Sequence, residues 1–195
     1  MWVFPCSDLE FGAKAGVNFA TVDGEDTGNI DGKTGFHLGL VAEIPISNSF
    51  AFQPEILYSS QGAKSKVSDT YMNVNFSTKE DLTFDYINIP LLAKYAITPG
   101  LSLHAGPQVG FLVNAKDEYE YVINGEKESG TEDMKDEIKN FDFAIAAGLS
   151  YKLEMGIFFN ARYNAGLSNI IDDDGSSEDY NIHNNVFQLS VGFMF

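Results

Sequence analysis

Apolar residues alternate with small or polar residues along much of this 195-residue chain, and the last alternating segment ends on an aromatic residue, Phe195. In residues 186–195 every second side chain from Phe187 onward is apolar, with Gln188 and Ser190 between them. A period of two places the two kinds of side chain on opposite faces of a β-strand. An apolar face opposite a small and polar face, repeated through a chain, is typical of a barrel with lipid outside and a packed polar interior.

Eight segments follow this alternation, and the connections between them alternate in length. Three connections are short and four are long, as in an outer-membrane barrel with tight periplasmic turns and large extracellular loops. The sequence therefore predicts an all-β fold, an eight-stranded antiparallel up-and-down transmembrane β-barrel. The expected strands are 11–22, 35–45, 50–64, 82–96, 101–115, 138–152, 157–168 and 186–195, and the expected long loops are 23–34, 65–81, 116–137 and 169–183.

Hydropathy agrees with this prediction. No apolar run approaches the length of a transmembrane helix, which excludes a helical membrane protein. The mean hydropathy of −0.11 is compatible with barrel strands, since each needs only about 10 residues, half of them apolar. The alternative is a soluble lipocalin-like barrel whose apolar face surrounds a ligand. Against it, the second face is rich in glycine and poor in lysine and glutamate.

The formal net charge of −16 argues against nucleic acid as a partner, because no basic stripe is available to neutralise phosphates. The single cysteine, Cys6, precludes an intramolecular disulfide. Residues 1–10 lack the basic and apolar regions of a secretory signal. We interpret residues 1–10 as a trimmed leader or a cloning remnant, with the natural signal peptide missing from this sequence, and residues 11–195 as the barrel domain.

Several segments are distinctive when taken together: Phe11–Asn18, Phe52–Ser59, Ile87–Tyr95, His104–Gln108 and Arg162–Leu167, together with the terminal Phe195. They resemble the eight-stranded outer-membrane β-barrel family common in Bacteroidetes, whose members are often labelled porin-family or OmpA-like proteins. The resemblance implies a bacterial outer-membrane location, contact with lipid, and insertion by the outer-membrane assembly machinery, which reads a terminal strand ending in an aromatic residue. It does not imply one activity.

Five charged residues are expected on the inward face, in the lower or middle part of the lumen. An eight-stranded barrel has an interior just wide enough to be filled by side chains, and buried charges must be paired. The prediction is a salt-bridge network that plugs the lumen, and the alternative is a narrow ion path. The residues are Lys14 and Glu43 on one pair of adjacent strands, Glu55 and Lys94 on another, and Arg162.

Carboxylates are concentrated in the third and fourth long loops. Clustered oxygens suit calcium, but the spacing lacks the alternating ligands of an EF-hand, and a solvated loop is the simpler interpretation. We expect no cofactor, with calcium as a weak candidate. The candidate ligands are Asp172, Asp173, Asp174 and Glu178.

Three histidines are present, but no Gly-x-Ser-x-Gly motif accompanies them. We interpret them as polar rim or lumen residues, with His37 and His183 near the outer rim and His104 near the periplasmic rim. The sequence therefore predicts a non-enzymatic barrel with a structural or binding role through its extracellular loops, as a monomer or as an accessory subunit with a protein partner in the membrane. A narrow solute or ion channel and a lipid- or peptide-modifying enzyme are the alternatives.

Overall fold

A computed structural model describes residues 9–24, 30–71, 74–123, 126–135, 138–169 and 182–195. These residues form one antiparallel β-sheet, and none of them forms a helix long and apolar enough to cross a membrane. The strands are β1 (Glu10–Gly24), β2 (Ile30–Pro45), β3 (Phe50–Tyr71), β4 (Val74–Ala96), β5 (Leu101–Ile123), β6 (Glu126–Asp133), β7 (Phe141–Lys152), β8 (Ile157–Gly166) and β9 (Ile182–Met194).

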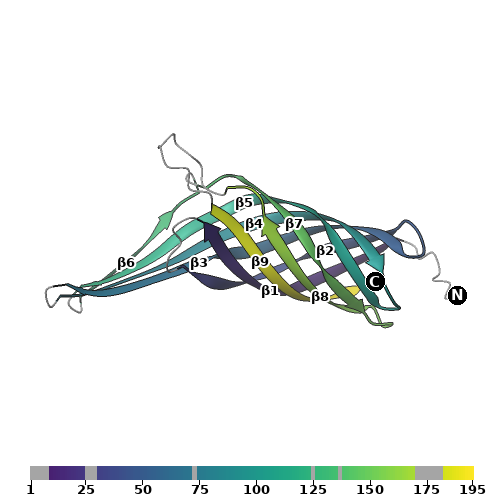
Figure 1. The fold of residues 1–195 in the computed structure, drawn as a ribbon, viewed down its shortest axis with the longest axis horizontal. Coiled ribbons are helices and arrows are strands. Elements are labelled where there is room, and N and C mark those ends of the chain that lie inside the picture. Colours follow the sequence, from purple (N-terminus) through teal and green to yellow (C-terminus); the bar gives the residue numbers. More distant parts are fainter. Residues whose placement is uncertain (1–8, 25–29, 72–73, 124–125, 136–137, 170–181) are drawn as a thin grey trace.

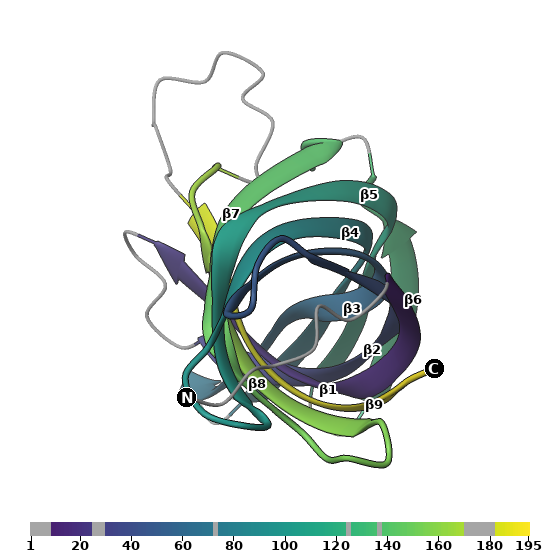
Figure 2. The same cartoon turned by 90° about the vertical axis from the view of Figure 1, so that its right-hand side faces the viewer.

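Eight of the strands close into a ring, which Figure 2 shows end on. Each ring strand pairs with its neighbours in the chain, β1 pairs with β9, and β5 pairs with β7. The remaining strand, β6, lies outside the ring, and within the part of the chain that the structure describes it pairs only with β5. The eight-stranded up-and-down barrel predicted from the sequence is therefore confirmed.

The two faces of the barrel are chemically opposite, as the alternation predicts. On β1, Phe11, Val17 and Phe19 are exposed on the outer face, while Lys14 and Asn18 are buried on the inner face. An exposed apolar exterior around a polar interior is the reverse of a lipocalin, so the soluble alternative is wrong. Aromatic pairs gather on the outer face toward both ends of the barrel: Phe19–Phe187, Phe36–Tyr58 and Phe111–Phe141 toward one, Phe50–Tyr95 and Phe193–Phe195 toward the other.

The strands β3, β4 and β5 continue well beyond the rim of the ring and carry β6 with them (Figure 1). We call this part the extension: residues 64–71, 74–83, 116–123 and 126–133. Its register is continuous, with Lys64 opposite Asp81, Asp81 opposite Glu118, and Glu118 opposite Thr131. The start of β1 and the end of β9 lie at the opposite end of the barrel, which carries the short turns (Figure 1).

The prediction of loops over 65–81 and 116–137 is therefore wrong for most of their length. Most of these residues are polar, and the apolar period of two that identifies a strand inside the membrane band is not sustained along them. Ladder hydrogen bonds and cross-strand ion pairs hold the sheet instead, and neither is visible in a single segment of sequence.

An apolar cluster fills the inner face of the barrel next to the extension. Ile138, which lies in the connection between β6 and β7, is buried in this cluster. The strand predicted over 138–152 begins only at Phe141, the first residue of β7. Backbone hydrogen bonds hold the connection against β5: the Leu112 amide donates to the Asn140 carbonyl at 2.9 Å. The cluster comprises Phe84, Tyr86, Leu112, Ala115 and Ile138, with Leu82 and Met134 packed against it.

Candidate functional site

The centre of the lumen is a carboxylate held by two cations. Glu55 on β3 accepts hydrogen bonds from Nη1 and Nη2 of Arg162 on β8, at 2.8 and 2.6 Å, and lies 2.7 Å from Nζ of Lys14 on β1. The amide of Gln53 also donates to Glu55 at 2.7 Å. The side chains of Lys14, Glu55 and Arg162 are almost completely buried, so this is a three-charge cluster with little access to water.

The other two predicted lumen residues form a second ion pair. Nζ of Lys94 on β4 lies 2.7 Å from Glu43 on β2, and both side chains are mostly buried. Neither Lys14 with Glu43 nor Glu55 with Lys94, the residues on adjacent strands, forms an ion pair in the described residues. The pairs instead join strands across the interior, because inward side chains of a narrow barrel meet there.

A neutral hydrogen-bonded network lies further along the lumen, and the sequence did not single it out. Nδ1 of His37 lies 2.7 Å from Oδ1 of Asn18, and Nε2 of His37 lies 2.7 Å from Oγ of Ser190. Asn18 donates in turn to Ser59 at 2.9 Å, and Gln188 donates to Asn18 at 3.0 Å. His37 is fully buried on the lumen face, next to Phe36 of the aromatic band at this end of the barrel.

The Ser190–His37–Asn18 series has the connectivity of a hydrolase triad, with a hydroxyl, an imidazole and an orienting group in order. All three side chains are buried inside the lumen, and Asn18 also donates to the backbone carbonyls of Phe36 and Ser60 on the neighbouring strands. A nucleophile must reach its substrate, and this hydroxyl does not lie at a surface. We therefore interpret the Ser190–His37–Asn18 hydrogen bonds as part of the packing of the barrel interior.

Charges on the extension are sorted between its two faces. Successive side chains of a strand point to opposite faces, so the register assigns every residue to one of them. The outer face, continuous with the apolar exterior of the barrel, carries all the lysines of the extension. They are Lys64, Lys66, Lys79, Lys116 and Lys127, with the carboxylates Asp81, Glu118, Glu120 and Asp133 among them. The inner face, continuous with the lumen face, carries Glu80, Asp117, Glu126, Glu128 and Glu132 with the tyrosines Tyr119 and Tyr121.

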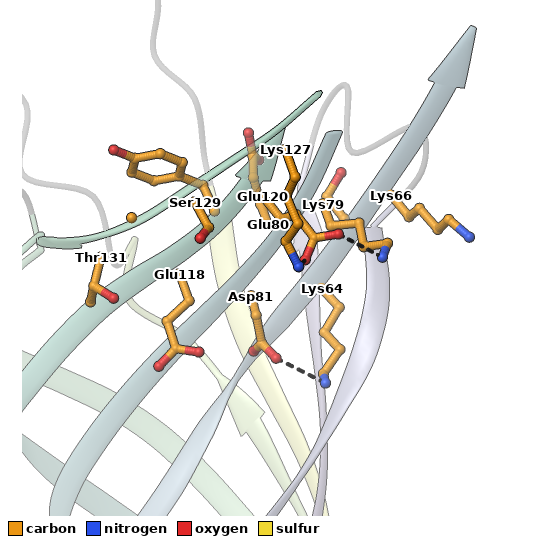
Figure 3. Close-up of a pocket in the computed structure, with 13 residues that line it drawn as sticks. Lys64, Lys66, Lys79, Glu80, Asp81, Glu118, Glu120, Lys127, Ser129 and Thr131 are labelled. Atoms are coloured by element: carbon orange, nitrogen blue, oxygen red, sulfur yellow. Dashed lines mark hydrogen bonds and ion pairs between the residues drawn. The ribbon is translucent and has the colours of Figure 1, made fainter. Parts of the chain in front are cut away.

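Two carboxylates of the outer face are each held between two lysines. Asp81 forms ion pairs with Lys33 and Lys64, and Nζ of Lys64 lies 2.9 Å from its carboxylate. Burial alone would raise the pKa of Asp81. The hydrogen bonds from the two ammonium groups outweigh burial, so the pKa of Asp81 is lowered. Glu120 lies 2.6 Å from Lys127 and 3.0 Å from Lys79, and these hydrogen bonds lower the pKa of Glu120 (Figure 3).

Gly62 allows Lys33 to reach across the sheet to Asp81. Its φ is +143°, and a Cβ there would lie 2.0 Å from the carbonyl oxygen of Leu82 and 3.3 Å from Cδ of Lys33. Only glycine adopts such a backbone without strain. The absence of a side chain at Gly62 thus leaves room on β3 for the stem of Lys33, which comes from β2.

The inner face of the extension carries carboxylates without any lysine to neutralise them. Burial, together with the charges of Glu80 and Glu132, raises the pKa of Asp117. Oδ1 of Asp117 is buried and accepts no hydrogen bond from the described residues. Beside it the rings of Tyr119 and Tyr121 lie 5.2 Å apart. This surface combines negative charge with an aromatic pair.

A hollow of about 680 Å³ lies on the extension, between β3, β4, β5 and β6. Lys64, Lys66, Lys79 and Lys127 contribute to its lining, and Figure 3 shows these side chains with Glu118 and Glu120. Nothing in the described residues groups three potential ligands around a metal. The weak calcium candidates Asp172, Asp173, Asp174 and Glu178 lie outside the described residues, so calcium binding stays a prediction.

Comparison with known proteins agrees with this geometry. Residues 4–172 match the model of the outer membrane protein beta-barrel domain. The attachment invasion locus protein Ail of Yersinia pestis superposes with a TM-score of 0.53 at 16% identity, covering 97% of this chain and 100% of that chain. Ail in complex with the heparin analogue sucrose octasulfate gives 0.50 at 15% identity, with the same coverage. Neisserial surface protein A gives 0.49 at 12% identity, covering 95% of this chain and 97% of that chain. No curated protein matches.

The apolar exterior, the aromatic bands and the family match place this barrel in the bacterial outer membrane, in contact with its lipid. The short turns between strands therefore face the periplasm, and the extension projects outside the cell. This chain belongs to the outer membrane protein β-barrel domain family.

Proposed function

We propose that this protein is a non-enzymatic surface barrel that binds an extracellular partner through the inner face and free edge of the extension. The observation that carries the proposal is the edge strand β6, which pairs with β5 on one side and with no other strand of the described residues. An unpaired edge offers backbone donors and acceptors to an added strand. The barrel itself anchors this sheet to the membrane.

The chemistry of the inner face defines the partner. Glu128 and Glu132 project from the edge strand toward the side that carries Asp117, Tyr119 and Tyr121. An extended segment with lysine or arginine at alternate positions would pair with the edge and place its cations against these carboxylates and rings. Such a partner is either a soluble protein or a larger membrane complex of which this barrel is an accessory subunit.

The double variant Glu128→Lys/Glu132→Lys tests this proposal, because it reverses the charge of the inner face at the edge. The protein is purified from native outer membranes in mild detergent, and co-eluting proteins are identified and quantified by mass spectrometry. We expect a stoichiometric partner to be lost from this variant. The control variant, Ser129→Lys/Thr131→Lys, adds two lysines to the outer face of β6, and we expect it to retain the partner. A clean monomer from the unaltered protein would remove the binding role.

The lumen is closed by side chains in this proposal. The Glu55 cluster, the His37 network and the apolar cluster around Tyr86 follow one another along the interior. An eight-stranded barrel leaves no aqueous path once its inward side chains are packed. We therefore place the protein apart from the porins, and propose a narrow channel only as the alternative.

Conductance across a planar bilayer checks this closure. We expect no stable openings, since an ion would have to cross both the buried charge cluster and the apolar cluster. Steady channels on the nanosiemens scale would contradict the closed lumen. A variant in which Tyr86 and Ile138 are both replaced by alanine tests the charge cluster and the apolar cluster separately. If the Glu55 cluster alone is enough to block ions, this variant should show no conductance either.

The last strand supports insertion by the outer-membrane assembly machinery. Strand β9 ends at Met194, and the exposed Phe195 follows it with its amide bonded to the carbonyl of Phe11 on β1. The terminal aromatic ring is thus held on the outer face at the seam where the barrel closes. We propose that this strand is the segment that the machinery recognises.

A further inference from the structure

The backbone of β6 directs alternate residues to β5 and to the open edge of the sheet. The amide of Met134, just after β6, donates to the carbonyl of Ala115 at 3.1 Å, so these two residues form a hydrogen-bonded pair. Hydrogen-bonded and non-hydrogen-bonded pairs alternate along an antiparallel ladder. Glu128, Gly130 and Glu132 therefore direct their backbone groups to β5. The residues between and beside them direct their backbone groups to the open edge: Lys127, Ser129, Thr131 and Asp133.

This alternation fixes how a strand added to the edge meets the two faces of the sheet. In an antiparallel addition, the residues opposite Ser129 and Thr131 exchange backbone hydrogen bonds with β6, and their side chains lie on the outer face. The residues opposite Glu128, Gly130 and Glu132 form non-hydrogen-bonded pairs, in which side chains approach most closely. Each inner-face position of β6 therefore meets one side chain of the added strand at close range.

A tyrosine ring from β5 covers the middle of this edge. Gly130 is directly opposite Tyr119, and a Cβ at Gly130 would lie 2.3 Å from Oη and 2.4 Å from Cζ of Tyr119. The phenol ring therefore lies across Gly130, in the place where a side chain of the edge strand would stand. A residue added opposite Gly130 would contact this ring, and a guanidinium group stacks on the face of an aromatic ring.

The carboxylates on either side of Gly130 determine the charge of the added strand. Glu128 and Glu132 are both exposed on β6. A second copy of this chain is a poor occupant, because antiparallel pairing centred on Gly130 would place Glu128 of each copy opposite Glu132 of the other. Like charges directly opposite one another destabilise a sheet. A strand with a cation at both positions would form two cross-strand ion pairs instead.

We propose that the edge of β6 binds an extended segment with the pattern Arg-x-Arg-x-Arg, in which x is threonine or serine. The two outer arginines lie opposite Glu128 and Glu132. The central arginine lies opposite Gly130 and stacks on Tyr119. The residues between them lie on the outer face beside the hydroxyl side chains of β6, and hydroxyl groups pair across strands. This assignment rests on the binding role proposed above and specifies the sequence that the partner presents.

Synthetic peptides test the pattern with the full chain in a non-ionic detergent. The probe is Arg-Thr-Arg-Thr-Arg, which carries a neutral fluorescent dye on a Gly-Gly linker, and fluorescence anisotropy gives its dissociation constant. The control peptide Arg-Arg-Thr-Thr-Arg has the same composition and charge but places threonine at the central position. We expect the control to bind at least about twofold more weakly, because it loses the stacked arginine.

N-methylated peptides separate strand addition from attraction between charges. Methylating the amides of both threonines removes the two donors that face β6, so we expect binding to weaken by at least about tenfold. Methylating the amides of the central and last arginines places the methyl groups on the side away from β6. This second peptide has the same composition and charge, and we expect it to bind like the probe.

The variant Ser129→Pro tests the same contact from the side of the protein. It removes an amide donor at the open edge that the ladder to β5 does not use, and proline is tolerated there. Ser129→Ala is the matched control, since it removes the hydroxyl group but keeps the amide. We expect Ser129→Pro to weaken binding of the probe by at least about fivefold and Ser129→Ala by less than about twofold. Heat-dependent migration on gels verifies that the barrel of each variant is folded.

Three results would overturn the assignment. One is equal binding of the two N-methylated peptides, which would mean that arginines bind the acidic face without adding a strand. The second is unchanged binding of the probe to Ser129→Pro, and the third is equal binding of Arg-Arg-Thr-Thr-Arg and the probe. The peptides require no native partner, so this test and the co-purification from native membranes fail separately. A partner lost from Glu128→Lys/Glu132→Lys, together with any of these three results, would keep the binding role and reject the sequence pattern.

Discussion

The substitution Glu55→Gln is expected to destabilise the folded barrel by about 3–5 kcal/mol. Glu55 is the carboxylate that neutralises both Lys14 and Arg162, and all three side chains are almost completely buried. Glutamine keeps the size of the side chain but leaves two cations in the lumen without a counter-charge. Urea-dependent unfolding from phospholipid vesicles, followed by circular dichroism, measures the change in the free energy of unfolding.

Two controls separate the buried charge from other effects of substitution. Replacing Lys14, Glu55 and Arg162 together by methionine removes every charge of the cluster, so it should cost far less than Glu55→Gln alone. Glu43→Gln breaks the Lys94 pair, which is less completely buried, and should cost less as well. A loss below about 1 kcal/mol for Glu55→Gln, as at an exposed ion pair, would show that water reaches the cluster.

The substitution Leu40→Lys is expected to cost about 2–4 kcal/mol in a bilayer. Leu40 is 60% exposed on the outer face of β2, between Phe36 of one aromatic band and the end of the strand at Pro45, opposite Ala13 of β1 and Ile56 of β3. A lysine there must enter hydrocarbon, whereas the same change on a water-exposed surface would be nearly neutral. The same vesicle unfolding measurement gives the difference.

Ile46→Lys is the matched control for Leu40→Lys. Ile46 is 71% exposed, but it lies in the short turn between β2 and β3, at the periplasmic end of the barrel. Its replacement should change the free energy of unfolding little. Similar small costs at both positions would mean that the outer face at Leu40 does not contact hydrocarbon.

Much of the candidate site could be anticipated one residue at a time. Lys14, Glu43, Glu55, Lys94 and Arg162 were predicted to face the lumen, and each does so, because the inward or outward direction follows from counting along a strand. Their pairing could not be anticipated. Whether Glu55 meets Lys94 or Arg162 depends on the stagger of strands around the ring and on how side chains cross a narrow interior.

The residues missed by sequence reasoning are mostly neutral. Asn18, Ser190 and Gln188 look like ordinary inward polar residues, and His37 carries no motif. Their importance comes from hydrogen bonds between strands that are far apart in the chain, such as the 2.7 Å contact of His37 with Ser190. No local pattern reports such contacts.

The sequence by itself determined the strands within the membrane, their two faces, the eight-stranded ring and the end that carries the short turns, because a period of two and the length of a connection are local properties. Only the tertiary structure decided that the residues around Lys64 and Glu120 form a sheet rather than loops. Outside the hydrocarbon both faces of a strand are wet, so the sequence loses its apolar period. There the strand exists because partner strands satisfy its backbone, and that partnership also gathers its lysines onto one face of the sheet, beside the carboxylates that pair with them.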